Sequence, residues 1–135
     1  MRPATARYRK LIATALAARR NAHAPYSKFR VGAALLTQSG KVYTGVNVEN
    51  ASYGLTNCAE RVAVGAAVSD GHRQFQAIAV AGPGTVLSPC GACRQVLSEF
   101  GDCVVICVDS RNTKRVRINL LSELLPHGFR LHLRG

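Results

Sequence analysis

Two short segments place cysteines where helices are expected to begin, and they constrain the fold more than any other feature of the chain. They are N-C-A-E-R at residues 57–61 and S-P-C-G-A-C-R-Q at residues 88–95. A helix N-terminus presents free N–H groups and a partial positive charge, which lower the pKa of a thiol and favour the thiolate. Three thiolates at such positions form a soft site suited to zinc.

Only three of the five cysteines stand at such positions, namely Cys58, Cys90 and Cys93. Cys103 and Cys107 lie within the apolar run C-V-V-I-C-V, where a free cysteine behaves as a small hydrophobic residue. A structural zinc has four protein ligands, whereas a catalytic zinc has three and an open position for water. The count favours a catalytic zinc. A C-x-x-C pair alone also occurs in redox proteins and zinc ribbons, and the odd number of cysteines argues against a disulfide framework.

Charged residues beside these cysteines suggest how such a site is completed. Glu60 lies two residues after Cys58, on the opposite side of the first helical turn, so it is expected to move protons and not to bind the metal. The alternative is a carboxylate that only stabilises the helix N-terminus. Three thiolates on one Zn²⁺ leave a net negative charge, which Arg61 and Arg94 could offset by donating hydrogen bonds to sulfur. The alternative is that both arginines are simply solvated.

Hydrophobic periodicity along the rest of the chain predicts one α/β domain over residues 1–135. The expected order of elements, α-β-β-α-β-α-β-α, is typical of a mixed sheet covered by helices on both faces. Asn57 is expected to cap the second helix. The predicted helices cover residues 4–20, 58–68, 90–100 and 119–125, and the predicted strands cover residues 29–37, 41–48, 75–81 and 103–108.

Composition excludes several classes of protein. The chain is 47% hydrophobic and 19% charged, so it is not expected to be disordered, and it has no apolar run long enough to span a bilayer. Its first residues, MRPATARYRK, do not resemble a secretory signal, so we expect a cytoplasmic protein. The net charge of +11 raises the alternative of a nucleic-acid partner, but no aromatic residues accompany the basic cluster over residues 111–117.

Five segments of the chain form an ordered set of motifs. They are P-Y-S-K-F-R-V-G-A-A-L (25–35), T-G-V-N-V-E-N-A-S-Y-G (44–54), N-C-A-E-R (57–61), S-P-C-G-A-C-R-Q (88–95) and E-L-L-P-H-G-F (123–129). Together they resemble the small, homotetrameric, zinc-dependent cytidine deaminases of the cytidine/deoxycytidylate deaminase superfamily. The resemblance extends from about residue 24 to residue 129, and five ordered blocks are far more specific than a lone P-C-x-x-C. It implies a three-layer α-β-α sandwich around a mixed five-stranded sheet.

The resemblance implies hydrolysis of cytidine and 2′-deoxycytidine to uridine and 2′-deoxyuridine, with release of ammonia, in pyrimidine salvage. Cys58, Cys90 and Cys93 would hold one Zn²⁺ per subunit. Zinc-bound hydroxide would attack C4 of the base, while Glu60 protonates N3 and then the departing amine.

The resemblance also assigns residues to the nucleoside. Phe29 would stack on the pyrimidine, and Asn47 and Glu49 would bind a ribose hydroxyl. In the homotetramer each site would be completed by residues of a neighbour, at the positions of Ala51, Tyr53 and Phe129. The short basic tail R-L-H-L-R-G departs from the family pattern near Phe129. Without the resemblance, Phe29 would be interpreted as a core residue and N-V-E-N as a turn.

Three alternatives remain open from the sequence. The first is deamination of another aminopyrimidine, such as an aminoacyl-nucleoside antibiotic of the blasticidin type. The second is an enzyme that acts on polynucleotides, which the +11 charge would favour. The chain has no insertion that would form a channel for a nucleic-acid strand. The third is a structural zinc module with a fourth protein ligand and no turnover.

Overall fold

The computed structural model describes residues 3–84 and 87–131, in which five strands form one mixed sheet in the order β2-β1-β3-β4-β5. β3 and β4 pair in parallel, and the other neighbouring strands pair antiparallel. The helix α4 connects the two parallel strands, as a parallel pair requires. The strands are β1 (Gly32–Thr37), β2 (Val42–Val46), β3 (Phe75–Gly82), β4 (Val104–Asp109) and β5 (Val116–Leu120).

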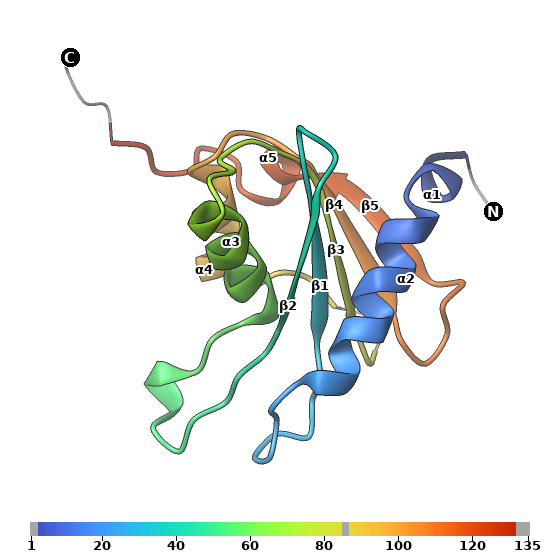
Figure 1. Cartoon of the computed structure of the whole chain (residues 1–135), viewed down its shortest axis with the longest axis vertical. Helices are drawn as coiled ribbons and strands as arrows, with labels where there is room; N and C mark the ends of the chain where they lie inside the picture. The colour runs from blue at the N-terminus through green and yellow to red at the C-terminus, as the bar shows by residue number, and fades with distance from the viewer. Residues whose placement is uncertain (1–2, 85–86, 132–135) are drawn as a thin grey trace.

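Helices cover both faces of this sheet, which gives three layers (Figure 1). On one face lie α1 (Pro3–Arg7) and α2 (Arg9–Ala18), and on the other lie α3 (Ala59–Ser69) and α4 (Gly91–Ser98). Each face has its own buried hydrophobic cluster, one containing Leu35 and Ile78 and the other containing Ile106 and Ala79. The predicted three-layer α/β architecture and mixed five-stranded sheet are confirmed.

The N-terminal helix differs from the prediction of one continuous helix over residues 4–20. Tyr8, with φ −108° and ψ 16°, separates α1 from α2, and a 3₁₀ turn (Arg19–Asn21) follows α2. The side chain of Tyr8 is buried in the same cluster as Leu11 and Ile12. The predicted apolar face is therefore correct, although the helix is interrupted.

The strand β5 near the C-terminus was not predicted from hydrophobic periodicity. Residues 119–125 were expected to be helical, whereas Asn119 and Leu120 end β5 and only Leu121–Leu124 form the helix α5. Val116, Ile118 and Leu120 alternate with Arg117 and Asn119, which is the pattern of a strand with one apolar face. The alternation was not recognised because it overlaps the end of the basic cluster over residues 111–117. Glu123 stabilises the start of α5 by accepting a hydrogen bond from the Leu120 N–H at 2.7 Å.

Several boundaries near the candidate ligands also differ from the predictions. β1 begins at Gly32 and β2 ends at Val46, so residues 29–31 and 47–48 lie outside the two strands. Cys58, and not Asn57, is the N-cap of α3. The backbone of Asn57 instead exchanges two hydrogen bonds with Val48, of 2.9 and 3.0 Å. Cys103 precedes β4 and Cys107 lies within it, and both are buried as expected.

Two glycines allow the helices to pack closely on the sheet. A Cβ on Gly45 of β2 would lie 2.3 Å from the Ala59 carbonyl oxygen and 2.5 Å from the Ala63 nitrogen, both in α3. A Cβ on Gly32 of β1 would lie 2.2 Å from the Ala15 carbonyl oxygen of α2. Backbone atoms cannot move away as a flexible side chain can. The first turn of α3, which carries the candidate site, is therefore fixed against β2.

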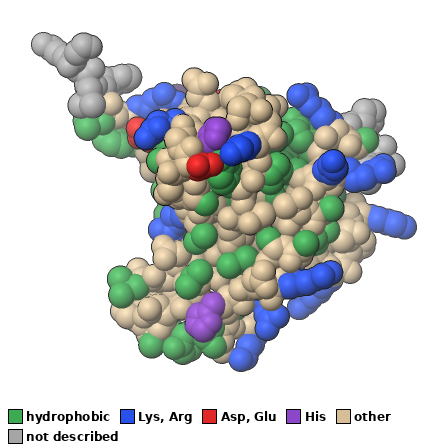
Figure 2. Space-filling model, viewed as in Figure 1, with side chains coloured by type: hydrophobic (Ala, Val, Ile, Leu, Met, Phe, Trp, Pro, Cys, Tyr) green, Lys and Arg blue, Asp and Glu red, His purple; other side chains and the backbone are tan. Residues whose placement is uncertain are grey.

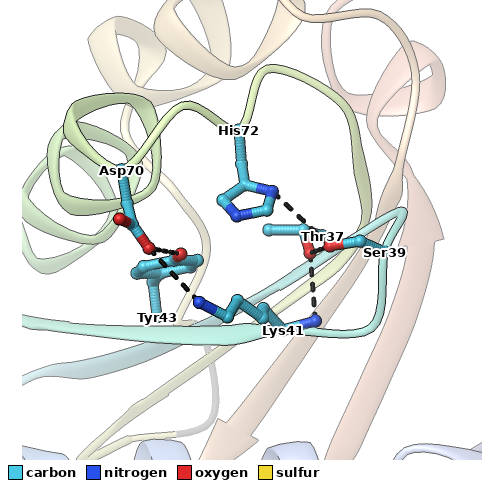
Figure 3. A network of polar contacts seen from close by, with 6 residues as sticks. All are labelled: Thr37, Ser39, Lys41, Tyr43, Asp70 and His72. Atoms are coloured by element: carbon cyan, nitrogen blue, oxygen red, sulfur yellow. Dashed lines mark hydrogen bonds and ion pairs between the residues drawn. The ribbon is translucent and has the colours of Figure 1, made fainter.

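A polar network holds the other end of α3 against the β1–β2 hairpin (Figure 3). Asp70, at the C-cap of α3, accepts hydrogen bonds from the Tyr43 hydroxyl and from Lys41 Nζ. The bond to Asp70 raises the pKa of Tyr43 to about 12. Ser39 lies between the Thr37 hydroxyl and a ring nitrogen of His72. The hairpin thus contacts α3 near both of its ends.

The surface in Figure 2 is unevenly charged. Lysine and arginine side chains gather over the N-terminal helices, whereas hydrophobic side chains gather on the projecting segment between β2 and α3. Within the part of the chain that the structure covers, no helix has the length and apolar character needed to span a membrane.

The close packing at Gly45 generates a prediction. Gly45→Ala should destabilise the fold by about 3 kcal/mol, because its methyl group would overlap backbone atoms of α3. The matched control is Gly65→Ala on the exposed side of α3, where a Cβ has no heavy atom within 4 Å. The control should stabilise the helix by about 0.8 kcal/mol. Urea unfolding at one fixed protein concentration measures both, and equal effects would contradict the packing argument.

Candidate functional site

Three cysteine side chains meet where α3 and α4 begin. Cys58 is the N-cap of α3 and Cys90 is the N-cap of α4, while Cys93 lies in the first turn of α4. The Sγ atoms of Cys58 and Cys90 are 4.0 Å apart, those of Cys90 and Cys93 are 3.3 Å apart, and all three lie within 4.8 Å of one another. The structure therefore brings together the three cysteines that the sequence singled out.

The thiols of this cluster differ in acidity. A hydrogen bond from Cys93 and the guanidinium of Arg61 lower the pKa of Cys58 to about 5, although partial burial acts in the opposite direction. The hydrogen bond to Cys58 and burial raise the pKa of the Cys93 thiol. The surroundings of Cys58 therefore favour its thiolate, whereas those of Cys93 favour the neutral thiol.

The arrangement fits a zinc ion. Zinc–sulfur bonds of about 2.3 Å in a tetrahedral site place two sulfurs about 3.8 Å apart, close to the observed separations. The amide of Cys93 also donates a hydrogen bond of 3.4 Å to Cys90 Sγ, so this sulfur is already oriented at the helix N-terminus. Cys103 and Cys107 do not belong to the cluster of candidate ligands found among the described residues. The three cysteines form a site for one zinc ion.

The two arginines next to the cysteines have different surroundings. Arg61 donates a hydrogen bond from Nη2 to Cys58 Sγ at 3.4 Å, as the charge argument anticipated. The guanidinium of Arg94 instead bonds the Pro89 carbonyl oxygen at 2.8 Å, the Leu124 carbonyl oxygen at 2.7 Å and Ser88 Oγ at 2.7 Å. The expectation that Arg94 contacts a thiolate is therefore incorrect. Its planar fork joins the loop before α4 to α5.

Glu60 lies in the first turn of α3 and is only 5% exposed. Burial raises the pKa of its carboxyl group, and the negative charge of Cys58 acts in the same direction. A carboxyl group that binds a proton more readily than usual is suited to general acid–base chemistry near neutral pH. Glu60 also affects the pKa of Cys93, which indicates that the carboxylate lies beside the thiol cluster.

The segment over residues 47–49 runs directly beside the start of α3. Val48 pairs with Asn57, the residue before Cys58, on one side and with His23 on the other. His23 donates its N–H to the Asn47 carbonyl oxygen at 3.0 Å and accepts a bond from the Glu49 N–H at 2.8 Å. These backbone pairs connect the predicted nucleoside-binding residues to the first zinc ligand.

Asn47 and Glu49 both hold the loop that precedes β1 and carries Phe29. The Asn47 side chain accepts a hydrogen bond from the Val31 N–H at 2.9 Å and donates one to the Phe29 carbonyl oxygen at 2.7 Å. Glu49 Oε1 accepts bonds from the N–H groups of Tyr26 and Ser27, at 3.0 and 3.1 Å. The Phe29 side chain is 40% exposed, so it is not a core residue.

Two further predicted substrate residues, Ala51 and Tyr53, are exposed to solvent. Glu49 and Tyr53 line one hollow together with Tyr26, Ser27 and Thr56, and the rings of Tyr26 and Tyr53 contact edge to face at 5.9 Å between centroids. Tyr53 is 74% exposed, and Ala51 is exposed in the same segment.

Phe129 is 70% exposed near the other end of the chain. Its carbonyl oxygen accepts a hydrogen bond of 2.9 Å from Gln95 Nε2 in α4. The segment that carries Phe129 is therefore attached to the helix that carries Cys93, and its ring extends into solvent in the isolated chain.

Sequence reasoning missed one polar residue of the site, Ser27. Its hydroxyl donates to Glu49 Oε2 and accepts a bond of 3.0 Å from the Phe29 N–H. The available signal was its position between Pro25 and Phe29 in a segment rich in turn-forming residues, where a serine hydroxyl commonly bonds the backbone two residues ahead.

Comparison with known proteins agrees with this geometry. Residues 5–108 match the family described as the cytidine and deoxycytidylate deaminase zinc-binding region. The chain is 58% identical over 95 residues to a cytidine deaminase of Sporosarcina psychrophila, covering 67% of this chain and 68% of that protein. It is 37% identical over 110 residues to a blasticidin-S deaminase of Bacillus cereus, covering 74% and 76%.

A solved structure extends the similarity over almost the whole fold. The crystal structure of cytidine deaminase from Burkholderia pseudomallei aligns with a TM-score of 0.86 at 50% sequence identity, covering 90% of this chain and 98% of that one.

The fold and the three thiols beside a buried carboxylate define a zinc-dependent deaminase. Identity, coverage and the matched zinc-binding region then fix the family. The chain belongs to the cytidine deaminases of the cytidine and deoxycytidylate deaminase family.

Zinc content provides a direct test of the ligand set. Cys93→Ser should lose more affinity for zinc than the roughly 10–100-fold that follows removal of an outer hydrogen-bond partner, because a ligand itself is changed. Cys107→Ala is the matched control, since Cys107 is also buried but lies outside the cluster. Elemental analysis after dialysis against a weak chelator should find zinc retained in the control. Loss of zinc from Cys107→Ala would contradict the three-ligand site.

Proposed function

We propose that the chain deaminates cytidine and 2′-deoxycytidine to the corresponding uridines, with release of ammonia, in pyrimidine salvage. The observation that carries this proposal is the junction of three elements. Two helix N-termini supply the thiol cluster, the first of them also supplies Glu60, and the segment over residues 47–49 lies beside them. We further propose that residues 1–135 form a single domain that acts in the cytoplasm.

Cys58, Cys90 and Cys93 would hold the zinc ion, with Arg61 offsetting the charge of the Cys58 thiolate. Bound zinc supplies Lewis acidity, which makes a water molecule nucleophilic at neutral pH. Arg94 supports the site indirectly, because its three hydrogen bonds fix the loop that leads into Cys90.

Glu60 would act as the proton shuttle. In the overall reaction a water oxygen bonds to C4 of the base and the bond from C4 to the exocyclic nitrogen breaks. The Glu60 carboxylate accepts a proton from the attacking water and passes it to N3. It then accepts the remaining proton from the new hydroxyl on C4 and transfers it to the amino group, which departs as ammonia while the C4 oxygen becomes the carbonyl of the uridine. The raised pKa of this buried group favours its protonated form during the transfer.

Asn47 and Glu49 would bind a ribose hydroxyl through the hydrogen-bonding capacity that they do not use within the chain. The Asn47 amide has two N–H donors, and the described bond to Phe29 uses one of them. Glu49 Oε2 accepts the Ser27 hydroxyl and retains a lone pair. A hydroxyl that donates to Glu49 and accepts from Asn47 satisfies both groups. The exposed ring of Phe29 is then free to stack on the pyrimidine.

A homotetramer would complete each site. Tyr53 and Phe129 are the two most exposed aromatic side chains of the predicted site, which is an unfavourable arrangement for an isolated chain in water. We propose that Ala51, Tyr53 and Phe129 of neighbouring subunits close the nucleoside pocket, so that the assembly covers these rings and excludes solvent.

Replacement of the proposed proton shuttle should abolish most turnover. Glu60→Gln keeps the size of the side chain but cannot accept a proton, so kcat for cytidine should fall by about 10²–10⁴-fold or more. Zinc content should be unchanged, because Glu60 is not a member of the thiol cluster. Cytidine absorbance and elemental analysis on the same sample measure both quantities. Unchanged turnover in Glu60→Gln would rule out this role.

A substrate panel with Glu49→Ala should separate the alternatives. For cytidine and deoxycytidine, kcat/KM should fall by about 10–100-fold, the range expected for a lost hydrogen bond to a charged group. Free cytosine, which lacks the sugar, should lose much less, because only the support that Glu49 gives to the loop carrying Phe29 is removed. Equal losses on all substrates would contradict the proposed contact between Glu49 and a ribose hydroxyl. Faster turnover of a blasticidin-type nucleoside than of cytidine would favour the antibiotic as substrate, and conversion of single-stranded oligonucleotides would favour a polynucleotide substrate.

A further inference from the structure

The loop over residues 24–31 carries Phe29, and two side chains from the segment over residues 47–49 form hydrogen bonds near both of its ends. At its C-terminal end, the Asn47 amide bonds the Phe29 carbonyl oxygen and the Val31 N–H. At its N-terminal end, the Glu49 carboxylate accepts the N–H groups of Tyr26 and Ser27. Substrate recognition and loop structure therefore depend on the same polar groups.

Ser27 connects these groups to one another. Its Oγ donates to Glu49 Oε2, while the same oxygen accepts a hydrogen bond of 3.0 Å from the Phe29 N–H. One hydroxyl therefore contacts both the carboxylate proposed to bind ribose and the backbone of the residue proposed to stack on the base. Lys28, between Ser27 and Phe29, has φ of 61°, so the loop turns sharply and brings these groups together.

The bond to Ser27 also determines which oxygen of Glu49 can bind substrate. Oε1 accepts two backbone N–H groups, which occupies its usual bonding capacity. Oε2 accepts the serine hydroxyl and has room for one more donor. These three bonds hold the carboxylate in one orientation and leave a single acceptor position on Oε2. Glu49, Ser27 and Tyr53 line one hollow of the surface.

We propose that Ser27 is a positioning residue for the nucleoside: its hydroxyl orients the Glu49 carboxylate toward a ribose hydroxyl and fixes Phe29 at the matching distance for the base. This inference rests on the proposed function. It assigns Ser27 a role in sugar selectivity that goes beyond its participation in a turn.

The test is a comparison of two substrates in two variants. In Ser27→Ala, kcat/KM for cytidine should fall by about tenfold, mainly through a higher KM, as expected when an interaction that orients the bound substrate is lost. For 2′,3′-dideoxycytidine, which lacks both ring hydroxyls of the ribose and keeps only the 5′-hydroxyl, the fall should be at most about twofold. Ser27→Thr keeps the hydroxyl and should restore most of the selectivity for cytidine.

Ser69→Ala is the matched control, because Ser69 is an exposed serine at the end of α3. It should leave both substrates unaffected. Equal losses on cytidine and dideoxycytidine in Ser27→Ala would show that Ser27 only shapes the loop, and would overturn the proposal. Unchanged kinetics in Ser27→Ala would also overturn it.

A pH profile gives a second readout that a purely structural role would not change. The Ser27 hydroxyl is the main cause of the lowered pKa of Glu49, with smaller contributions from the N–H groups of Ser27 and Tyr26 and from the charge of His23. A carboxylate accepts a ribose hydroxyl fully only when ionised. Removing the Ser27 hydroxyl raises the pKa of Glu49 toward its ordinary value. The acidic rise in KM for cytidine should therefore occur at a higher pH in Ser27→Ala than in the wild type.

Failure of this inference is distinguishable from failure of the proposed function. If the wild-type, zinc-loaded chain does not convert cytidine, the proposed function is wrong and the role of Ser27 falls with it. If the wild type is active but Ser27→Ala shows neither the substrate-dependent loss nor the shifted pH profile, only the role of Ser27 is wrong.

Discussion

The convergence of two helix N-termini on one group of sulfur atoms is the constraint on which the rest of the structure depends. Three thiols within 4.8 Å repel one another once ionised, so the fold must hold them in place by other means. Gly45 lets α3 lie directly on β2, and the Asp70 network attaches the far end of the same helix to the β1–β2 hairpin. Arg94 performs the equivalent task for α4, where three hydrogen bonds tie the preceding loop to α5. The cysteines can remain close because neither helix is free to move away.

The side chains proposed to bind the nucleoside also hold the loop that carries Phe29. Asn47 and Glu49 flank Val48, whose backbone pairs with His23 on one side and with Asn57 on the other. Their side chains form hydrogen bonds with residues 26–31. The donors and acceptors left over match one hydroxyl group. Such a site is largely preorganised, because its side chains do not need to be immobilised when the nucleoside binds.

Much of this could be predicted from the sequence, and the exceptions have physical causes. The cysteine ligands and Glu60 were predictable because helix-start signals and spacing are local properties. β5 was missed because it is short and its alternation of Val116 and Ile118 follows directly on a basic cluster, and because strand pairing with β4 depends on residues distant in the chain. Arg94 was assigned to sulfur because it adjoins Cys93, but its direction is set by carbonyl groups of Pro89 and Leu124. The turn-forming context of Ser27 was visible in the sequence, but its bond to Glu49 was not, because that partner lies 22 residues away.

The acidic side chains are few, and most of them accept hydrogen bonds that hold the fold together. The chain has seven aspartates and glutamates, two of which, Glu60 and Asp109, are buried. Five of the seven accept hydrogen bonds from the chain itself: Glu49, Asp70, Asp102, Asp109 and Glu123. A carboxylate that accepts a hydrogen bond keeps its negative charge, but seven acidic side chains cannot balance 18 lysines and arginines, so the net charge is +11. The surface therefore carries an excess of positive charge. Such a protein adsorbs to cation-exchange media and to polyanions without any site for them, and added salt releases it.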